Sequence, residues 1–328
     1  MTLISMLLAL IIERLAVRSD AWQARPYCQA YLNLTARSGM SKLAEHPLGR
    51  YLWIMLPGLL VALCLLLLDS RLITLIVNTL VLLVGIGCWH YRQLYKQYLN
   101  ALDRSDDEAA YLAMQQIRTD SRSTVDDSNG LLLVWLNFRY YAAVVFWFLL
   151  LGVFGVITYA LLRHLNEQTA LTAETATAQA DPLAQSTAAE AIIIDEAEVA
   201  IIVETEIVED IATSSDAAAT AAPVAGQSKD AVHYLLHWAD FFPARLFGLG
   251  FALVGYFSRA SNALLGYFLD VTANNQQVVT DVAKAAEPIL ESPQQNSDDT
   301  SAMVQLAKRN MLFFLAFTAI LTLSGWLS

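Results

Sequence analysis

The sequence predicts an all-α integral membrane protein, a polytopic helical bundle with about four full spans plus interfacial or re-entrant helices. Its 328 residues are 56% hydrophobic and only 16% charged, and the mean hydropathy is +0.45. In soluble domains about a quarter of the residues carry charge. Four stretches lack Asp, Glu, Lys and Arg over the roughly 17 to 25 residues that a helix needs to cross a bilayer. They are Leu52–Leu68, Leu72–His90, Tyr140–Leu162 and Met311–Ser328.

An N-terminal membrane body over residues 1–166 begins with a short helix. Its apolar run is interrupted by Glu13 and Arg14 and is therefore too short for a full span. No small-residue cleavage site follows the run, so a cleaved signal peptide is not expected. Adjacent helical residues point about 100° apart, and we expect one of these two charges to face the bundle. An ionisable side chain at membrane depth is a candidate for function.

A helical hairpin is expected over residues 52–90, because only the tripeptide 69–71 separates two apolar stretches. Pro57 lies inside the first helix, where neighbouring helices can satisfy the backbone group that a proline leaves free. Residues 91–139 then form an extramembrane helical loop. In this loop Ser105 and Glu108 have the spacing of a capping box, which predicts a helix from there to about Arg118.

A span over residues 140–162 follows, with Asn137 and Arg139 directly before it. Arg139 among Trp and Tyr residues is typical of the aromatic, positively charged belt at a membrane surface. That interpretation assigns Tyr140 and Tyr141 to the interface. It does not explain Asn137 or the apolar residues that precede it, so a binding site is the alternative.

The segment 167–229 is an acidic, Ala- and Thr-rich insert. It holds twelve acidic residues and one basic residue, and no aromatic residue. With so few large side chains to offset the entropy of ordering, we expect it to be largely disordered. The formal charge of -11 is therefore local to the insert, and without a basic stripe on the body nucleic-acid binding is not predicted.

The C-terminal membrane part covers residues 230–328. It is expected to contain an interfacial helix over 231–257, whose last twelve residues are apolar but short for a span, with Pro243 opening its second half. A polar loop over 273–300 and a last span over 311–327 follow. Gly248 and Gly250 indicate close helix packing rather than a phosphate-binding loop, because they lie in an apolar run.

His233 and His237 are weak candidates for a metal site. They stand four residues apart, on one face of a helix, with Asp240 three residues further on. A polar face of an interfacial helix explains the same spacing, and no third ligand is fixed by it. Three cysteines show no zinc-binding spacing and are expected to act as small apolar side chains; no metal or cofactor is predicted from these residues.

Asp240 and Arg245 lie on either side of Pro243 in the stretch DFFPAR. They can hold each other or bind an anion. The forked guanidinium of arginine suits carboxylates and phosphates. We expect these two residues to line one polar pocket near a membrane face, together with Glu13, Asn137 and Arg139.

The positive-inside rule sets the expected orientation. Eight Lys and Arg residues flank the spans on the face that carries residues 13–50 and 91–139, against four on the other face. We therefore place those two segments and the C-terminus in the cytoplasm. The acidic insert is then expected to be periplasmic.

The LVWLNFRYY and DFFPARLFG stretches, with Glu13-Arg14-Leu15, resemble in order and spacing the AmpE family of bacterial inner-membrane proteins. That family looks distantly similar to the CbiB/CobD family, membrane enzymes of cobalamin biosynthesis that use ATP. Asn137 and Pro243-Ala244-Arg245 agree with that family's pattern. The acidic residue of the CbiB/CobD pattern is replaced by Tyr140 in this sequence. The resemblance therefore implies ATP use and ligase activity only with altered chemistry.

The AmpE resemblance implies a regulatory membrane component connected with β-lactamase induction and with cell-wall recycling through muropeptides. We therefore expect a nonenzymatic modulator in the inner membrane, with a muropeptide or nucleotide as the possible ligand. The alternatives are a CbiB/CobD-like ATP-dependent ligase with altered chemistry and a structural membrane scaffold. The scaffold predicts that the polar residues named above do not converge.

Overall fold

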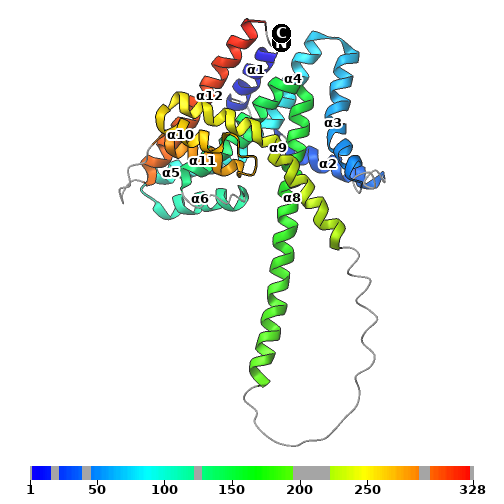
Figure 1. The fold of residues 1–328 in the computed structure, drawn as a ribbon, viewed down its shortest axis with the longest axis vertical. Helices are drawn as coiled ribbons and strands as arrows, with labels where there is room; N and C mark the ends of the chain where they lie inside the picture. Colours follow the sequence, from blue (N-terminus) through cyan, green and yellow to red (C-terminus); the bar gives the residue numbers. More distant parts are fainter. Residues whose placement is uncertain are drawn as a thin grey trace, which may run out of the picture. The chain divides into compact units, whose positions relative to one another are not determined.

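The structure is a computed structural model that describes residues 2–15, 22–38, 46–121, 128–194, 222–287 and 296–325. All regular segments within these ranges are helical, which confirms the all-α prediction. The chain divides into a larger unit, Met1–Leu161 with Leu236–Ser328, and a smaller one, Leu162–Leu235. The elements (Figure 1) are α1 Thr2–Leu15, α2 Ala24–Arg37, α3 Pro47–Leu68, α4 Arg71–Ile86, α5 Trp89–Asp103, α6 Asp107–Ser121, α7 Asn129–Asn137, the π-helix η3 Phe138–Ala142, α8 Ala143–Ile194, α9 Ala222–Val254, α10 Phe257–Phe268, α11 Asn275–Ala286 and α12 Asn296–Leu323.

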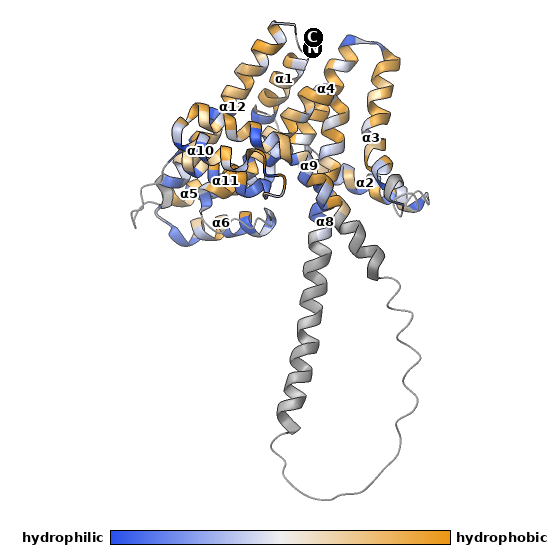
Figure 2. Cartoon of the chain, in the orientation of Figure 1, coloured by the Kyte–Doolittle hydropathy of each residue, from blue (hydrophilic) through white to orange (hydrophobic). Residues whose placement is uncertain are grey.

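Three described helices are long and apolar enough to cross a membrane: Gly49–Leu68, Asn129–Thr169 and Asp299–Leu323. A fourth crossing is formed if α4 and α5, which meet at an angle of 51°, are counted as one broken span. Figure 2 shows the concentration of apolar residues on these helices. The expected span Leu72–His90 is therefore corrected: α4 ends at Ile86, where Gly87 adopts a left-handed conformation with φ +31°.

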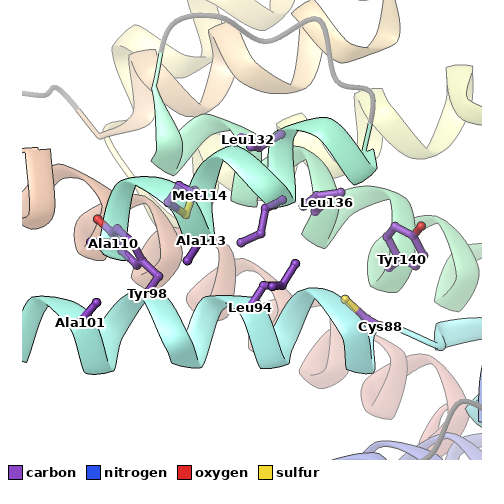
Figure 3. Packing of buried hydrophobic residues seen from close by; sticks show 11 residues of the cluster. Cys88, Leu94, Tyr98, Ala101, Ala110, Ala113, Met114, Leu132, Leu136 and Tyr140 are labelled. Carbon is purple, nitrogen blue, oxygen red and sulfur yellow. The ribbon is translucent and has the colours of Figure 1, made fainter. Parts of the chain in front are cut away.

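The helical loop after α4 packs as an apolar layer of α5, α6 and α7 (Figure 3). The predicted helix is present as α6, but its cap is Asp106, whose carboxylate accepts from the Ala109 N–H at 3.1 Å. The expected capping box is wrong, because Ser105 has φ +55° and belongs to the preceding turn. The buried residues of this layer are Cys88, Leu94, Tyr98, Ala101, Ala110, Ala113, Met114, Ile117, Leu132, Leu136 and Tyr140.

The apolar helix expected as one span over 140–162 is broken at Gly152. This residue has φ +62° and ψ −142°, a combination that is open to glycine but not to residues with a Cβ. A Cβ on Gly155 would lie 2.5 Å from the Trp147 carbonyl oxygen, so the segments before and after the break approach closely. The single straight span is thus replaced by a tight helical hairpin with Gly152 at its apex.

Contacts with α9 confirm that the two arms of this hairpin run side by side. Trp147 on the first arm donates to the Ala239 carbonyl at 3.2 Å, and Tyr159 on the second donates to Asp240 Oδ1 at 2.8 Å. In an unbroken helix Trp147 and Tyr159 would be separated by about 18 Å, yet they reach consecutive residues. The second arm therefore travels back, against the direction of α7.

The first arm of the hairpin runs parallel to α12. Gly130, at the start of α7, would place a Cβ 2.9 Å from Met303 near the start of α12. Further along, Phe247 contacts both Phe138 and Phe314, with ring centroids 5.5 and 5.9 Å apart. The C-terminal end of α12 thus lies away from the start of α7 at Asn129, which does not fit the expectation that residues 91–139 and the C-terminus share a face.

Three other expected segments differ in the structure. Pro243 does not open a helix, because α9 continues through it. The expected polar loop 273–300 contains α11, whose buried face includes Val278, Val279 and Val282. Helix occupies 167–194 and 222–229 of the insert that was expected to be largely disordered, while 195–221 lie outside the described residues.

Candidate functional site

The NFRYY stretch that stood out in the sequence forms the π-helix η3 between α7 and α8. Its bond runs from the Ala143 N–H to the Phe138 carbonyl, five residues back, and such single π-turns in α-helices are frequent at functional sites. The wider turn sends consecutive side chains into different surroundings. Phe138 stacks near Trp135, and Tyr140 packs on Tyr91 with ring centroids 5.3 Å apart.

Tyr140 is consequently part of the apolar layer and not an interface anchor. Arg139 is also displaced from its expected place at the end of a span, because apolar helix continues for ten residues before it, from Asn129. It is half-buried in η3. The interface-belt interpretation of this stretch is therefore wrong for the residues that suggested it.

Tyr141 belongs to a cluster with Glu13 and Arg92 in the larger unit. The Tyr141 hydroxyl donates to Glu13 Oε1 at 2.9 Å, and Arg92 Nη1 donates to the same oxygen. The residues come from η3, α1 and α5. The Glu13 side chain is 4% exposed and that of Arg92 35%, so a buried carboxylate is held by a cation that is still open to its surroundings.

Asn137 lies at the end of α7, one residue before the π-helix. Its side-chain oxygen Oδ1 is buried and has no hydrogen-bond partner among the described residues. Buried amide oxygens are almost always satisfied by protein, water or a ligand. Asn137 thus offers an acceptor beside the π-helix that carries Arg139 and Tyr141.

Asp240 is placed in the seam between α9 and the Gly152 hairpin. It is 4% exposed and accepts a hydrogen bond from Tyr159. The adjacent Ala239 carbonyl is the one that Pro243, which has no N–H, cannot bond. The Trp147 indole N–H donates to this carbonyl instead. The hairpin thus replaces the hydrogen bond that the proline removes from α9.

Arg245 is held by backbone oxygens. Its Nη2 donates to the carbonyls of Tyr267 at 3.3 Å and Asp270 at 2.7 Å, which lie at and just beyond the C-terminal end of α10. Helix C-termini present unbonded carbonyls and partial negative charge, and a cation stabilises both. Nη1 bonds Asn275 Oδ1 at 2.8 Å and the Phe241 carbonyl at 3.1 Å. Burial lowers the pKa of the Arg245 guanidinium from its ordinary value.

Asn275 connects Arg245 to His237. Its Nδ2 donates to the His237 carbonyl at 2.7 Å, and the His237 ring lies with Nε2 2.8 Å from the Val271 carbonyl. Since a carbonyl only accepts, Nε2 carries a proton. His233 is exposed. Among the residues that the structure describes, no three His, Cys, Asp or Glu side chains gather as they would around a metal ion.

The interactions described above place the five predicted site residues in three groups. Glu13 belongs to the cluster with Arg92 and Tyr141, Asn137 and Arg139 flank or lie in the π-helix, and Asp240 and Arg245 secure α9. Cavities of about 590 and 400 Å³ have other linings.

Sequence reasoning missed Arg92 and Asn275, and it took Tyr141 for an interface residue. Arg92 had one signal in the sequence: it is a charge within a turn of the end of an apolar stretch. Its partner Glu13 is 79 positions away, so no local pattern could join the two.

The profile of the family described as "Regulatory signalling modulator protein AmpE" matches residues 1–188 and 212–328. The "Protein AmpE" of Shigella flexneri is 25% identical over 343 residues, which cover 99% of each chain. No solved structure matches. Since the profile spans nearly all of both membrane parts, the chain belongs to the AmpE family of regulatory signalling modulators.

Proposed function

We propose that this protein is a nonenzymatic inner-membrane modulator of β-lactamase induction, acting in connection with muropeptide recycling. The family match over residues 1–188 and 212–328 carries the proposal. In the proposed orientation, residues 13–50 and the part of 91–139 that precedes the apolar helix starting at Asn129 face the cytoplasm. The signal reaches the protein there as an anionic small molecule, a muropeptide or a nucleotide.

The Glu13–Arg92–Tyr141 cluster is the proposed receptor for that signal. The Arg92 side chain is 35% exposed, and the geometry of a guanidinium suits a ligand carboxylate or phosphate in place of the Glu13 carboxylate. An incoming anion therefore competes with Glu13 for Arg92. Because Glu13, Arg92 and Tyr141 lie on three different elements, loss of the Glu13–Arg92 pair changes the constraint between α1 and α5.

Asn137 and Arg139 are proposed to complete the ligand contacts. The free Asn137 Oδ1 can accept from a ligand amide or hydroxyl. Asp240 and Arg245 are assigned to the support of α9 instead, since their bonds join protein elements.

The proposal is tested by measuring β-lactamase induction in an inducible bacterium whose own AmpE-type gene has been deleted. The strain is complemented with the wild-type chain, Arg92→Met or Glu13→Gln. Both variants should shift the response to a β-lactam at unchanged protein level in the membrane. Lys96→Met, an exposed cation one turn along α5, should behave as wild type. Identical induction in all four strains would remove the cluster from the signalling role.

A further inference from the structure

A cavity of about 590 Å³ lies among α2, α3, α4 and the second arm of the Gly152 hairpin. Its volume falls in the range of about 300 to 1,000 Å³ that small-molecule sites occupy. The lining is almost wholly apolar or aromatic: Trp22, Ala24, Tyr27, Cys28, Tyr31, Pro57, Val61, Leu80, Val81, Val84, Gly85, Val156, Ile157, Ala160 and Leu161.

One wall of the cavity is a single face of α2. Ala24, Cys28 and Tyr31 recur at helical spacing and point into it. The Tyr31 hydroxyl does not make the cavity polar, because it donates to the Trp53 carbonyl at 2.8 Å. That carbonyl stands four residues before Pro57 and has lost its helical donor. The proline therefore fixes Tyr31 with its ring on the cavity.

The opposite walls come from helices built for a membrane. Pro57 and Val61 lie in the apolar span Gly49–Leu68, and Val156 and Ala160 in the apolar helix Asn129–Thr169. An apolar cavity of this size gives water few hydrogen-bonding partners. In a bilayer, the hydrocarbon chains of lipids are available to fill the cavity.

The charge of α2, the helix that forms one wall of the cavity, indicates which lipid supplies the hydrocarbon. α2 carries Arg25 and Arg37, both exposed, and no acidic residue. With Trp22 and the exposed Tyr27 it has the composition of a helix that lies at a membrane surface and attracts anionic headgroups. Arg25 directly follows Ala24, which lines the cavity.

We propose that this cavity holds an acyl chain of an anionic phospholipid from the surrounding bilayer, with the phosphate of its headgroup at Arg25. The apolar walls take up the chain and exclude water. The arginine selects the negative headgroup. The site is separate from the Glu13–Arg92–Tyr141 cluster and does not depend on the signalling role proposed for it.

Native mass spectrometry of the full chain in detergent tests the proposal, with phosphatidylglycerol and phosphatidylcholine of identical acyl chains added separately. The wild-type chain should retain one phosphatidylglycerol with about fivefold preference, the ratio that corresponds to the ~1 kcal/mol of one cation near an anionic lipid. Arg25→Gln should bind both lipids equally. Equal binding of the two lipids by the wild-type chain overturns the headgroup assignment.

Filling the cavity tests the acyl chain. Ala160→Phe, and independently Val61→Phe on the facing helix, should lose the retained phosphatidylglycerol. Leu150→Phe, at an exposed position on the first arm, should keep it. Thermal unfolding by circular dichroism identifies which of the two filling variants is folded. Retention of the lipid by a folded filling variant overturns the proposal.

Discussion

Two arginines, Arg92 and Arg245, anchor polar groups of very different character. Arg245 bonds backbone carbonyls and an Asn amide oxygen, none of which changes charge. Arg92 bonds a buried carboxylate and is itself about one-third exposed. The first arrangement is fixed whatever surrounds the protein. The second contains an exchangeable partner, because another anion can replace Glu13.

This difference reverses what the sequence suggested. Arg245, in the conspicuous PARL stretch, supports the architecture, whereas the inconspicuous Arg92 has the chemistry of a binding group. A prominent motif in a membrane protein can therefore mark a place where a backbone carbonyl lacks its helical donor. The carbonyl that Pro243 leaves free accepts from Trp147, and the carbonyl that Pro57 leaves free accepts from Tyr31.

The largest expected effect is the loss of stability in Arg245→Met. The substitution removes the donor to the buried Asn275 Oδ1 and to the Asp270 carbonyl, and one of two donors to the Tyr267 carbonyl, which keeps the Asp270 N–H. A buried unsatisfied group costs about 1 to 3 kcal/mol, and each other lost hydrogen bond about 1 kcal/mol. We expect a loss of about 3 kcal/mol or more in a denaturant titration in detergent. Arg259→Met, at an exposed site on α10, is the matched control. Equal stability of the two variants would show that Arg245 is not architectural.

A double-mutant cycle measures how exchangeable the other arginine is. Glu13→Gln and Arg92→Met should each destabilise the protein, and the double variant should lose less than the sum of the two. A coupling of about 1 to 2 kcal/mol is expected, below that of a fully buried pair, because the exposed side of Arg92 is screened. Strictly additive losses in the same denaturant titration would contradict the pairing.

A smaller loss of stability is expected when the hydrogen bond that replaces the one lost at Pro243 is removed. Trp147→Phe removes the donor to the Ala239 carbonyl and should cost ~1 kcal/mol. In a Pro243→Ala background the cost should shrink, because residue 243 regains an N–H that reaches the same carbonyl within the helix. If Trp147→Phe costs the same in both backgrounds, the indole is there for packing alone.

The smallest expected effect is on the stability of the protein at low pH. The Thr272 hydroxyl and N–H hold the pKa of Asp270 below its ordinary value. A depressed carboxyl pKa stabilises the fold at pH values above the ordinary value, and this contribution is lost as pH falls through the folded-state pKa. Thr272→Val should raise the pKa of Asp270 in an NMR titration of labelled aspartate. Thr119→Val, at an exposed position on α6, should leave it unchanged.

The helical class and most helices could be predicted, because apolar length and helical spacing are local properties. The conformation of Gly152 could not be predicted. A glycine inside an apolar run ordinarily serves close packing, and no neighbouring residue indicates a positive φ. The expectation that either Glu13 or Arg14 faces the bundle is confirmed, because Glu13 is buried and Arg14 is exposed. The partners of Glu13 were not identified, because Arg92 and Tyr141 are 79 and 128 positions away and only the fold brings them together.

The apex at Gly152 also affects how the chain is divided between the two sides of a membrane. A straight helix over residues 129–169 would count as one crossing, and the residues before and after it would be assigned to opposite compartments. A hairpin counts as two passes or as none, so it leaves that assignment unchanged. Reporter fusions placed before Asn129 and after Leu161 should accordingly agree with each other, although the hydropathy of the segment alone would make them differ.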